Sequence, residues 1–574
     1  MVNLAKKFWC SEKVDCSVDA ICARMLVWVP ATSSIFLAND ESTRSFLMTY
    51  NIEIAQRPDR LRGESASTTE IALILPPATD APARVDKTGV ELKRGAFLNT
   101  IAMLASNFRG IFTFLVARLL GPAALGIFSV AWSTTDIISK IGVLGLDNAI
   151  TTFIARSEAV GNRARSRSLF HLAVVLGIAQ SVVTAGIVIV GLRFFNNRLH
   201  VQPQMLSALA LVLCAMPGLA LYRISTAISR GMKVMKHDIY SRGMTEPIAT
   251  TLAFLAALAV GFKESSPEVA AIVGTGASGL VALALASRLF RNVPSQATVV
   301  SPFTEARSLL GYAAPISIYQ LINAFISRLD LLMLGYFVGR APGVTLATVG
   351  VYSAVIDTAN GLRKVNQAFN PIFAPVVAGM TATGDHEIAA ATYARLAEWM
   401  LWILLPLVAV LSLAGSTILL IYGPAFWQGG VWLGIVALAS AINAFVALGE
   451  TVIMVQRPRL NLFHSSITCV VAVAGLLWLI PRFGVMGAAF GILLPYLVQG
   501  TLRYATLRWV FHWKDSWSDI RPPLIATGIA LAPALVCRMF LGGIVGQVVS
   551  AAVFLAVFGV QWWQHHIHRR DKHP

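Results

Sequence analysis

The chain has 574 residues, of which 56% are hydrophobic and only 13% are charged. This composition excludes an ordinary soluble globular protein, in which about a quarter of the residues are charged. The formal net charge of +17 would suit a nucleic-acid-binding protein, but the placement of the basic residues, described below, argues against that function.

Residues 1–95 differ from everything that follows them. They mix polar and apolar residues without a helical period, and they contain the helix-breaking pair Pro76-Pro77. An apolar stretch around Pro30 lacks the charged start and the small-residue cleavage site of a signal peptide. We expect a disordered cytoplasmic leader or, alternatively, translated sequence upstream of a true start such as Met48. We assign this segment no function.

From residue 96 onward, apolar runs of about 20 residues recur, which is the length that a helix needs to cross a bilayer core. The runs are continuous rather than alternating, and this excludes a transmembrane β-barrel. We therefore predict an all-α polytopic membrane protein with about fourteen transmembrane helices. The predicted spans are 96–119, 123–146, 168–192, 205–222, 243–262, 268–289, 309–338, 345–377, 396–421, 431–455, 462–480, 485–507, 522–541 and 543–563.

The basic residues follow this predicted topology. When the loops are numbered from a cytoplasmic N-terminus, the even-numbered loops hold nineteen Lys and Arg residues, Arg223 and Arg503 among them, and the odd-numbered loops hold seven. Lys and Arg mark the cytoplasmic loops of membrane proteins, so we predict that both termini are cytoplasmic. Because topology accounts for the positive charge, we expect no nucleic-acid partner.

One sequence pattern occurs twice. Gly126-Ile-Phe-Ser129 is followed by Lys140, and Gly350-Val-Tyr-Ser353 is followed by Lys364, fourteen residues after the glycine in each copy. Each copy lies in the second predicted span of its half, which predicts a parallel repeat about an axis along the membrane normal. A lysine inside a span costs about 2.5–3.5 kcal/mol on insertion scales. The pair therefore predicts two six-helix lobes around a central cationic cavity, and an anionic substrate.

The repeat and a polar, proline-broken stretch after residue 290 divide the chain. The cationic segment that begins at His565 resembles a metal-binding tract, but a cytoplasmic tail after the interfacial Trp562-Trp563 is the simpler interpretation. The predicted parts are an N-lobe of helices 1–6 at 96–290, a C-lobe of helices 7–12 at 309–508, helices 13–14 at 521–564 and a tail at 565–574.

Charged residues within the spans are the candidates for function, because such residues usually face the bundle interior or a wet cavity. Asp136 and Lys140 share a helix face and can pair, and Asp357 and Lys364 also share one. Both pairs could equally be ties between helices. Arg109 has no acidic neighbour within a turn, which favours a role facing an anion. Candidates for coupling a proton or sodium ion are Glu246, Glu398 and Glu450.

Four stretches, in order, resemble the Wzx-type flippases, the polysaccharide exporter branch of the multidrug/oligosaccharidyl-lipid/polysaccharide exporter superfamily. Their glycines and prolines end helices or allow close helix approach, so they report the fold rather than the substrate. The stretches are Val116-Ala-Arg-Leu-Leu-Gly-Pro-Ala-Ala-Leu-Gly-Ile-Phe-Ser129, then Arg328-Leu-Asp-Leu-Leu-Met-Leu-Gly335 with Gly350-Val-Tyr-Ser353 and Asn370-Pro371, then Ile421-Tyr-Gly-Pro424, and Pro481-Arg-Phe-Gly-Val-Met-Gly-Ala-Ala489.

The resemblance implies a transporter, not an enzyme. Such a protein flips oligosaccharide repeat units, linked by pyrophosphate to a polyprenyl lipid, across the bacterial cytoplasmic (inner) membrane for surface polysaccharide such as exopolysaccharide or O-antigen. Membrane lipids, a polysaccharide polymerase and a chain-length regulator are the implied partners. The residues that we expect to line the cavity and bind pyrophosphate or glycan are Arg109, Lys140, Arg328 and Lys364, and those expected to pair or couple an ion are Asp136, Asp357 and Glu450.

Three other functions compete with this interpretation. A multidrug cation antiporter of the same superfamily predicts a cavity dominated by carboxylates, and a peptidoglycan-precursor flippase would share the fourteen helices. A membrane glycosyltransferase or polymerase would need acidic motifs on outer loops, which the sequence does not contain. The cysteines lack metal-site spacing, and no phosphate-binding loop of the Gly-x4-Gly-Lys-Ser/Thr type is present. We therefore expect no metal and no cofactor.

Overall fold

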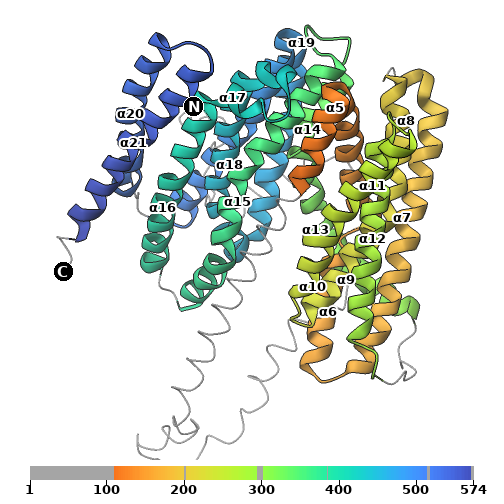
Figure 1. The fold of residues 1–574 in the computed structure, drawn as a ribbon. Helices are drawn as coiled ribbons and strands as arrows, with labels where there is room; N and C mark the ends of the chain where they lie inside the picture. The colour runs from red at the N-terminus through yellow and green to blue at the C-terminus, as the bar shows by residue number, and fades with distance from the viewer. Residues whose placement is uncertain (1–108, 200–201, 294–301, 384–385, 514–516, 571–574) are drawn as a thin grey trace, which may run out of the picture. The chain divides into compact units, whose positions relative to one another are not determined.

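The computed structural model describes residues 109–570, apart from 200–201, 294–301, 384–385 and 514–516 (Figure 1). The chain divides into two compact units, residues 1–86 and 87–574, and every described residue belongs to the second. The expectations for residues 1–95 fall outside the described residues.

The described part of the chain is helical and contains no strand, which confirms the predicted all-α class. The helices of its first half are α5 (Arg109–Val143), α6 (Leu146–Ala159), α7 (Arg163–Leu199), α8 (Pro203–Val212), α9 (Met216–Gly231), α10 (Lys236–Asp238), the π-helix η3 (Ile239–Thr245), α11 (Glu246–Val260) and α12 (Ser266–Arg288). Those of its second half are α13 (Pro302–Ile326), α14 (Leu329–Tyr336), α15 (Leu346–Thr383), α16 (His386–Leu413), α17 (Gly415–Leu419), α18 (Gly430–Gln456), α19 (Pro458–Ala505), the π-helix η5 (Thr506–Val510), α20 (Trp517–Phe540) and α21 (Gly543–Arg570).

Ten helices among the described residues are long and apolar enough to cross a membrane, or eleven if the two halves of α13, bent by 44°, form one span. The expected count of fourteen is not confirmed by this criterion. Part of the difference arises because two of the ten elements contain a reversal of the chain.

The first reversal lies in α5. Gly121 has φ 84° and ψ 178°, a backbone conformation that glycine adopts readily but that does not occur within an α-helix. The rings of Phe112 and Phe128 lie 5.3 Å apart, whereas sixteen residues of straight helix would separate them by about 24 Å. Helix α5 is therefore two adjacent arms joined at Gly121, which agrees with the break predicted between the spans 96–119 and 123–146.

The second reversal lies in α19, at Gly484 with φ 56° and ψ −131°. A Cβ atom on Gly487 would stand 2.3 Å from the carbonyl oxygen of Leu479, and one on Gly491 would stand 2.3 Å from a methyl group of Leu476. The residues before the turn thus face the residues after it in reverse order. Two antiparallel arms pack here with almost no side chain between them, as the glycines in this stretch predicted.

The two copies of the repeated pattern meet each other. A Cβ atom on Gly350 would lie 1.7 Å from the carbonyl oxygen of Pro122, and one on Gly126 would lie 2.4 Å from that of Leu346. Three residues after each glycine, the hydroxyls of Ser129 and Ser353 share a hydrogen bond of 2.6 Å. Equivalent positions of α5 and α15 are therefore in contact, and the glycines allow backbone to pack on backbone.

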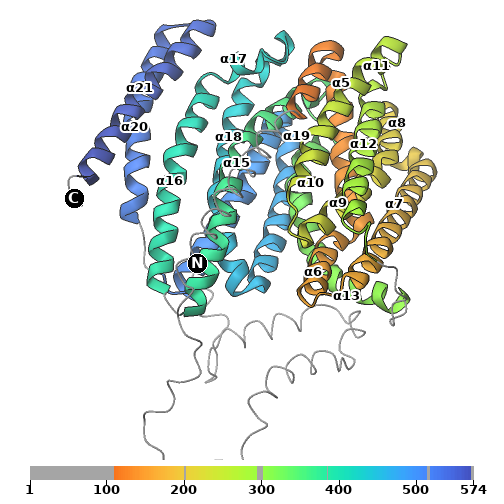
Figure 2. The same ribbon diagram turned by 60° about the horizontal axis from the view of Figure 1, so that its bottom comes forward.

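The buried side chains form three main clusters. The first joins α5, α15, α18 and α19, and the second joins α6, α7, α9, α12 and the first half of α13. The third joins α16 to the C-terminal hairpin α20–α21, which lies beside α16 in both views (Figures 1 and 2). Helix α21 continues to Arg570, so the segment predicted as a tail from residue 565 begins inside a helix.

Helix α13 packs on both halves of the chain. Leu309 and Ala313 belong to the cluster of α6 and α7, and Arg165 on α7 forms a 3.1 Å ion pair with Glu305. Ile326, at the other end of α13, belongs to the cluster that includes α18 and α19. The division into lobes at 96–290 and 309–508 stays a prediction.

Candidate functional site

A cavity of about 100 Å³ lies between α5, α11, α12, α14 and α15. We call it the aromatic pocket, because three aromatic rings of α5 line it. Phe112 lies on the first arm of α5, and Phe128 and Trp132 lie on the second. The described lining residues comprise aromatic, charged and hydroxyl-bearing side chains, with a few apolar ones between them. They include Phe112, Phe128, Trp132, Glu246, Arg328, Asp357, Thr113, Ser129, Ser133, Thr250, Thr275 and Ser353.

The charged groups of the aromatic pocket come from different elements. Glu246 begins α11 directly after the π-helix η3 and is 3% exposed. Arg328 occupies the break between α13 and α14, at the N-cap position of α14. Asp357 is an exposed residue of α15, one turn past Ser353. The structure thus brings two of the predicted site residues, Arg328 and Asp357, to one cavity.

The break at Arg328 separates it from its acidic neighbour. Asp330 turns into the core, where it is 2% exposed and accepts a 2.9 Å hydrogen bond from the hydroxyl of Tyr352. Tyr352 is fully buried and belongs to the second copy of the repeated pattern. Asp330 therefore ties α14 to α15, and Arg328 is left facing the cavity.

A smaller cavity of about 40 Å³ lies where the second arm of α5 ends, against α6, α9 and α13. We call it the Lys140 pocket. Gly145 has a left-handed conformation between α5 and α6, and a Cβ atom there would lie 2.3 Å from the hydroxyl oxygen of Ser317. The described residues that line the pocket are Lys140, Val143, Gly145, Asp147, Arg223, Ser317 and Gln320.

An ion pair fixes one wall of the Lys140 pocket. Arg223 donates to the Asp136 carboxylate over 2.7 Å and to the Ser139 hydroxyl over 2.9 Å, and its side chain is only 13% exposed. Lys140, one turn after Asp136, has no ion pair with any carboxylate of the described residues. The predicted partnership of Asp136 and Lys140 is thus replaced by that of Asp136 and Arg223.

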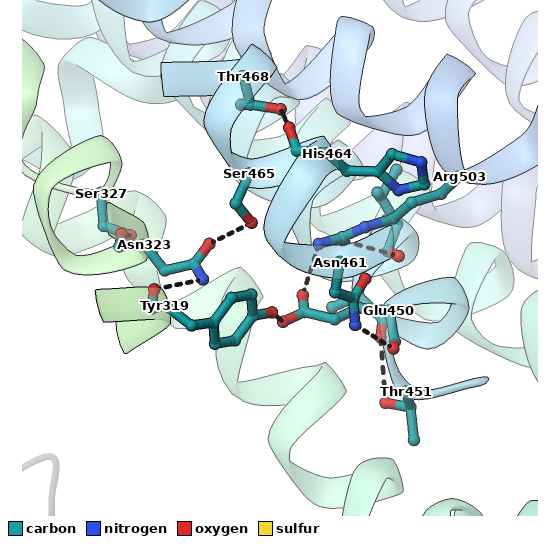
Figure 3. Close-up of polar contacts among 12 residues, drawn as sticks. Tyr319, Asn323, Ser327, Glu450, Thr451, Asn461, His464, Ser465, Thr468 and Arg503 are labelled. Carbon is teal, nitrogen blue, oxygen red and sulfur yellow. Dashed lines mark hydrogen bonds and ion pairs between the residues drawn. The ribbon is translucent and has the colours of Figure 1, made fainter. Parts of the chain in front are cut away.

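The carboxylate of Glu450 is held in a polar network within the second half of the chain (Figure 3). Arg503 donates to Glu450 over 2.8 Å and to the Val446 carbonyl over 3.1 Å, and its side chain is 3% exposed. The hydroxyl of Tyr319 on α13 also donates to Glu450. The amide of Asn461 donates to the Glu450 carbonyl oxygen over 3.0 Å. We call these groups the Glu450 network.

The network extends along α13 and α19. Ser465 donates to the side-chain oxygen of Asn323 over 3.3 Å (Figure 3). Thr506, the first residue of η5, is hydrogen-bonded to His464 over 3.1 Å. Asn323 lies one turn after Tyr319 on the same face of α13. Three elements, α13, α18 and both arms of α19, are therefore joined around one carboxylate.

The two remaining predicted lining residues are Lys364, which is not among the described residues that line either cavity, and Arg109. Lys364 is a half-buried residue of α15, two turns after Asp357. Arg109 begins α5, and its side chain falls outside the described residues. The neighbouring Arg363 remains within the protein, where it donates to the Tyr496 hydroxyl over 2.6 Å.

Sequence reasoning missed Arg223 and Arg503 because it placed both in cytoplasmic loops. The predicted span 205–222 ends just before Arg223, but α9 continues to Gly231. Arg503 lies inside the predicted span 485–507 and inside α19, but it was counted among the basic residues of the loop that follows. The signal was present after Arg223, where no glycine or proline interrupts the chain until Gly231. Charge had been taken as the end of the helix, although it marked only a polar face.

Comparisons with known proteins agree with this fold. Residues 92–377 match the model of the family described as "Polysaccharide biosynthesis protein". A lipid II flippase MurJ in an inward closed conformation superposes with a TM-score of 0.60 at 11% identity, covering 83% of this chain and 99% of that one. An inward-facing multidrug resistance MATE family transporter of the MOP superfamily superposes with a TM-score of 0.58 at 12% identity, covering 73% and 98%. No curated protein sequence matches the chain.

The apolar helices define a multi-pass membrane protein, and its fold is shared with a MATE family transporter and with MurJ. Within that class, residues 92–377 of the chain are similar to the polysaccharide biosynthesis protein family.

Proposed function

We propose that this protein flips oligosaccharide repeat units, linked by pyrophosphate to a polyprenyl lipid, across the bacterial cytoplasmic membrane for surface polysaccharide biosynthesis. The observation that carries the proposal is the Lys140 pocket. There an ammonium group without an ion-pair partner among the described residues lies beside the guanidinium of Arg223. The family match supports a glycan as the cargo, and the pyrophosphate of a lipid-linked glycan supplies the anion.

The two cations suit different parts of phosphate recognition. Arg223 is oriented by Asp136 and Ser139, so its planar guanidinium is presented in a fixed direction. Lys140 is a point charge on a flexible stem that can follow a moving phosphate. The protein moves its substrate without making or breaking a bond, so no catalytic residue is assigned.

The remaining site residues enter the proposal with separate roles. Arg109, Arg328 and Lys364 line the path of the pyrophosphate and glycan, and Asp357 pairs or couples an ion there. Access alternates as the two lobes rock against each other, with both termini in the cytoplasm. The polymerase and the chain-length regulator receive the flipped unit on the outer side.

A second candidate function is export of organic cations by the same movement. The aromatic pocket favours it, because two carboxylates, Glu246 and Asp357, and three aromatic rings line one cavity. Aromatic faces and carboxylates are the groups that bind organic cations. The family match supports a glycan rather than an organic cation as the cargo, so we rank this function second.

The test is complementation in the bacterium whose polysaccharide locus carries this gene. The chromosomal copy is deleted, and the wild type or a variant is supplied on a plasmid. Surface polysaccharide and lipid-linked repeat units retained inside the cell are measured together. We expect the wild type to restore polymer and to clear the internal units. Lys140→Ala should retain at least ten times more internal units than the wild type, and Lys140→Arg should recover most of the transport.

Lys263→Ala is the matched control, because Lys263 is an exposed lysine between α11 and α12. It should behave as the wild type at equal membrane levels. Failure of the wild type to clear internal units would contradict glycan flipping, and efflux of organic cations by the same cells would then support the second candidate. Full transport by Lys140→Ala would remove the Lys140 pocket from the mechanism.

A further inference from the structure

The aromatic pocket and the Lys140 pocket differ in charge although both lie along the second arm of α5. The described lining of the Lys140 pocket has two cations and one carboxylate, Asp147, whose side chain accepts a hydrogen bond from the Asn148 amide. A second carboxylate, Asp136, pairs with Arg223 and leaves Lys140 as the cation without an ion pair among the described residues. The charged lining described for the aromatic pocket is two carboxylates and one guanidinium. A substrate with a phosphate at one end would match the Lys140 pocket at that end. An uncharged or amine-bearing group at its other end would match the aromatic pocket.

We propose that the aromatic pocket is a seat for one sugar ring of the glycan and selects neutral and amine-bearing sugars against acidic ones. This inference rests on the proposed function, because it takes the transported glycan as the ligand. It adds a sugar-specific site that is distinct from the phosphate-binding site.

The chemistry of the lining suits a polyhydroxylated ring. Six hydroxyl groups, from residues such as Ser133, Thr250 and Thr275, can both donate and accept hydrogen bonds. Carboxylates accept hydrogen bonds from adjacent ring hydroxyls and from an ammonium group. A site built to hydrogen-bond the hydroxyls of its ligand discriminates strongly against ligands that lack them.

The aromatic wall provides the complement to these polar groups. Trp132 and Phe128 are stacked with their ring planes 20° apart and centroids separated by 6.1 Å, and Phe112 meets Phe128 edge to face. Together they supply apolar surface to the pocket, on which we expect the C–H face of a pyranose ring to pack while its hydroxyls turn to the polar groups. This combination of one apolar face and one polar face matches the two faces of a sugar.

The spacing of the pockets fits one continuous substrate. Lys140 stands eight residues after Trp132 on the same arm of α5, about 12 Å along the helix axis. A short oligosaccharide can cover this distance, so a ring seated against Trp132 remains attached to a pyrophosphate at Lys140. The carboxylates Glu246 and Asp357 disfavour the phosphate end in the aromatic pocket and thereby set the direction of the substrate.

The pocket is assembled from two groups of helices. Trp132 and Glu246 come from α5 and α11, whereas Arg328 and Asp357 come from α14 and α15. Any movement of α14 and α15 relative to α5 therefore changes the size of the pocket, so we expect sugar binding to be coupled to such a movement.

The experiment is saturation-transfer difference NMR on the purified full-length protein in detergent micelles. The probes are methyl glucoside, glucosamine, glucuronate and the organic cation tetraphenylphosphonium. We expect transfer to methyl glucoside and, more strongly, to glucosamine, and at least fivefold less to glucuronate. Asp357→Asn should reduce the preference for glucosamine over glucuronate at least fivefold, because it removes charge without changing shape.

Trp132→Ala should abolish transfer to all three sugars, and Trp563→Ala is its matched control, since Trp563 is an exposed residue of α21. Asp357→Asn keeps the test valid if Trp132→Ala fails to fold, because Asp357 is exposed. The proposal is overturned if no sugar gives a signal, or if the sugar signals are unchanged in Asp357→Asn. Transfer to tetraphenylphosphonium alone, lost in Asp357→Asn, would also overturn it and would favour cation export. Complementation does not depend on these signals, so flipping can hold where the sugar seat fails.

Discussion

The two halves of the chain each hold an ion pair inside the helical bundle, and the pairs differ in what surrounds them. Asp136 and Arg223 meet over 2.7 Å, and Glu450 and Arg503 meet over 2.8 Å. The first pair borders a small cavity that also contains Lys140. The second is enclosed by hydrogen bonds from α13 and α19, and Arg503 is 3% exposed.

This difference indicates that the two ion pairs have different roles. A cation next to a cavity, beside a lysine without a described ion-pair partner, can exchange contacts with a substrate. A cation whose contacts are all made within the protein can only hold helices together. We therefore expect the Glu450 network to govern stability and the Lys140 pocket to govern transport, and the four variants below test that division from the largest effect on stability to the smallest.

Arg503→Ala should have the largest effect. Removing one partner of a buried ion pair leaves an uncompensated charge, which costs about 3–5 kcal/mol. Because the Glu450 side chain is 32% exposed and water can solvate it, we expect the lower end of that range. The measurement is thermal unfolding in detergent, with Arg459→Ala as the control, since Arg459 is exposed. Unchanged unfolding of Arg503→Ala would contradict a structural role for the network.

Arg223→Ala should destabilise the protein by less, about 1–3 kcal/mol, which is the cost of an unsatisfied buried group. The Arg223 side chain is 13% exposed, against 3% for Arg503, so its removal uncovers less of the buried interior. The same variant should stop the clearance of lipid-linked units in the complementation assay. A destabilisation as large as that of Arg503→Ala, with transport retained, would reverse the division between the two pairs.

Tyr319→Phe should cost about 1 kcal/mol, the net contribution of one hydrogen bond. It removes only the hydroxyl that donates to Glu450 and leaves the ring in place. Because Tyr319 is the contact of α13 to this carboxylate, hydrogen exchange should increase around α13 while transport changes less than twofold. A complete loss of transport would indicate that Glu450 acts in ion coupling as well as in packing.

The sequence predicted much of the fold around the two ion pairs, but it did not predict which residues form those pairs. Glycines at 121 and 484 located both chain reversals, because a left-handed turn requires them. The repeated pattern marked the contact of α5 with α15. The partners of Asp136 and Glu450 could not be inferred, since Arg223 is 87 positions and Arg503 is 53 positions away in the chain. Only helix packing brings them together, and a single sequence does not encode that packing in any local pattern.

Lys140→Ala should have the smallest effect on stability and a large effect on transport. Its ammonium has no ion pair with the described residues, so its removal breaks no such contact and relieves the cost of a cation held within a membrane helix. The unfolding midpoint should therefore stay the same or rise, whereas internal lipid-linked units accumulate. Lys140→Met, which keeps the length of the side chain and removes its charge, should reproduce both effects. A fall in the unfolding midpoint of both variants would mean that Lys140 ties helices together. The distinction between a substrate-facing ion pair, Asp136–Arg223, and a structural one, Glu450–Arg503, would then fail, because it depends most on Lys140.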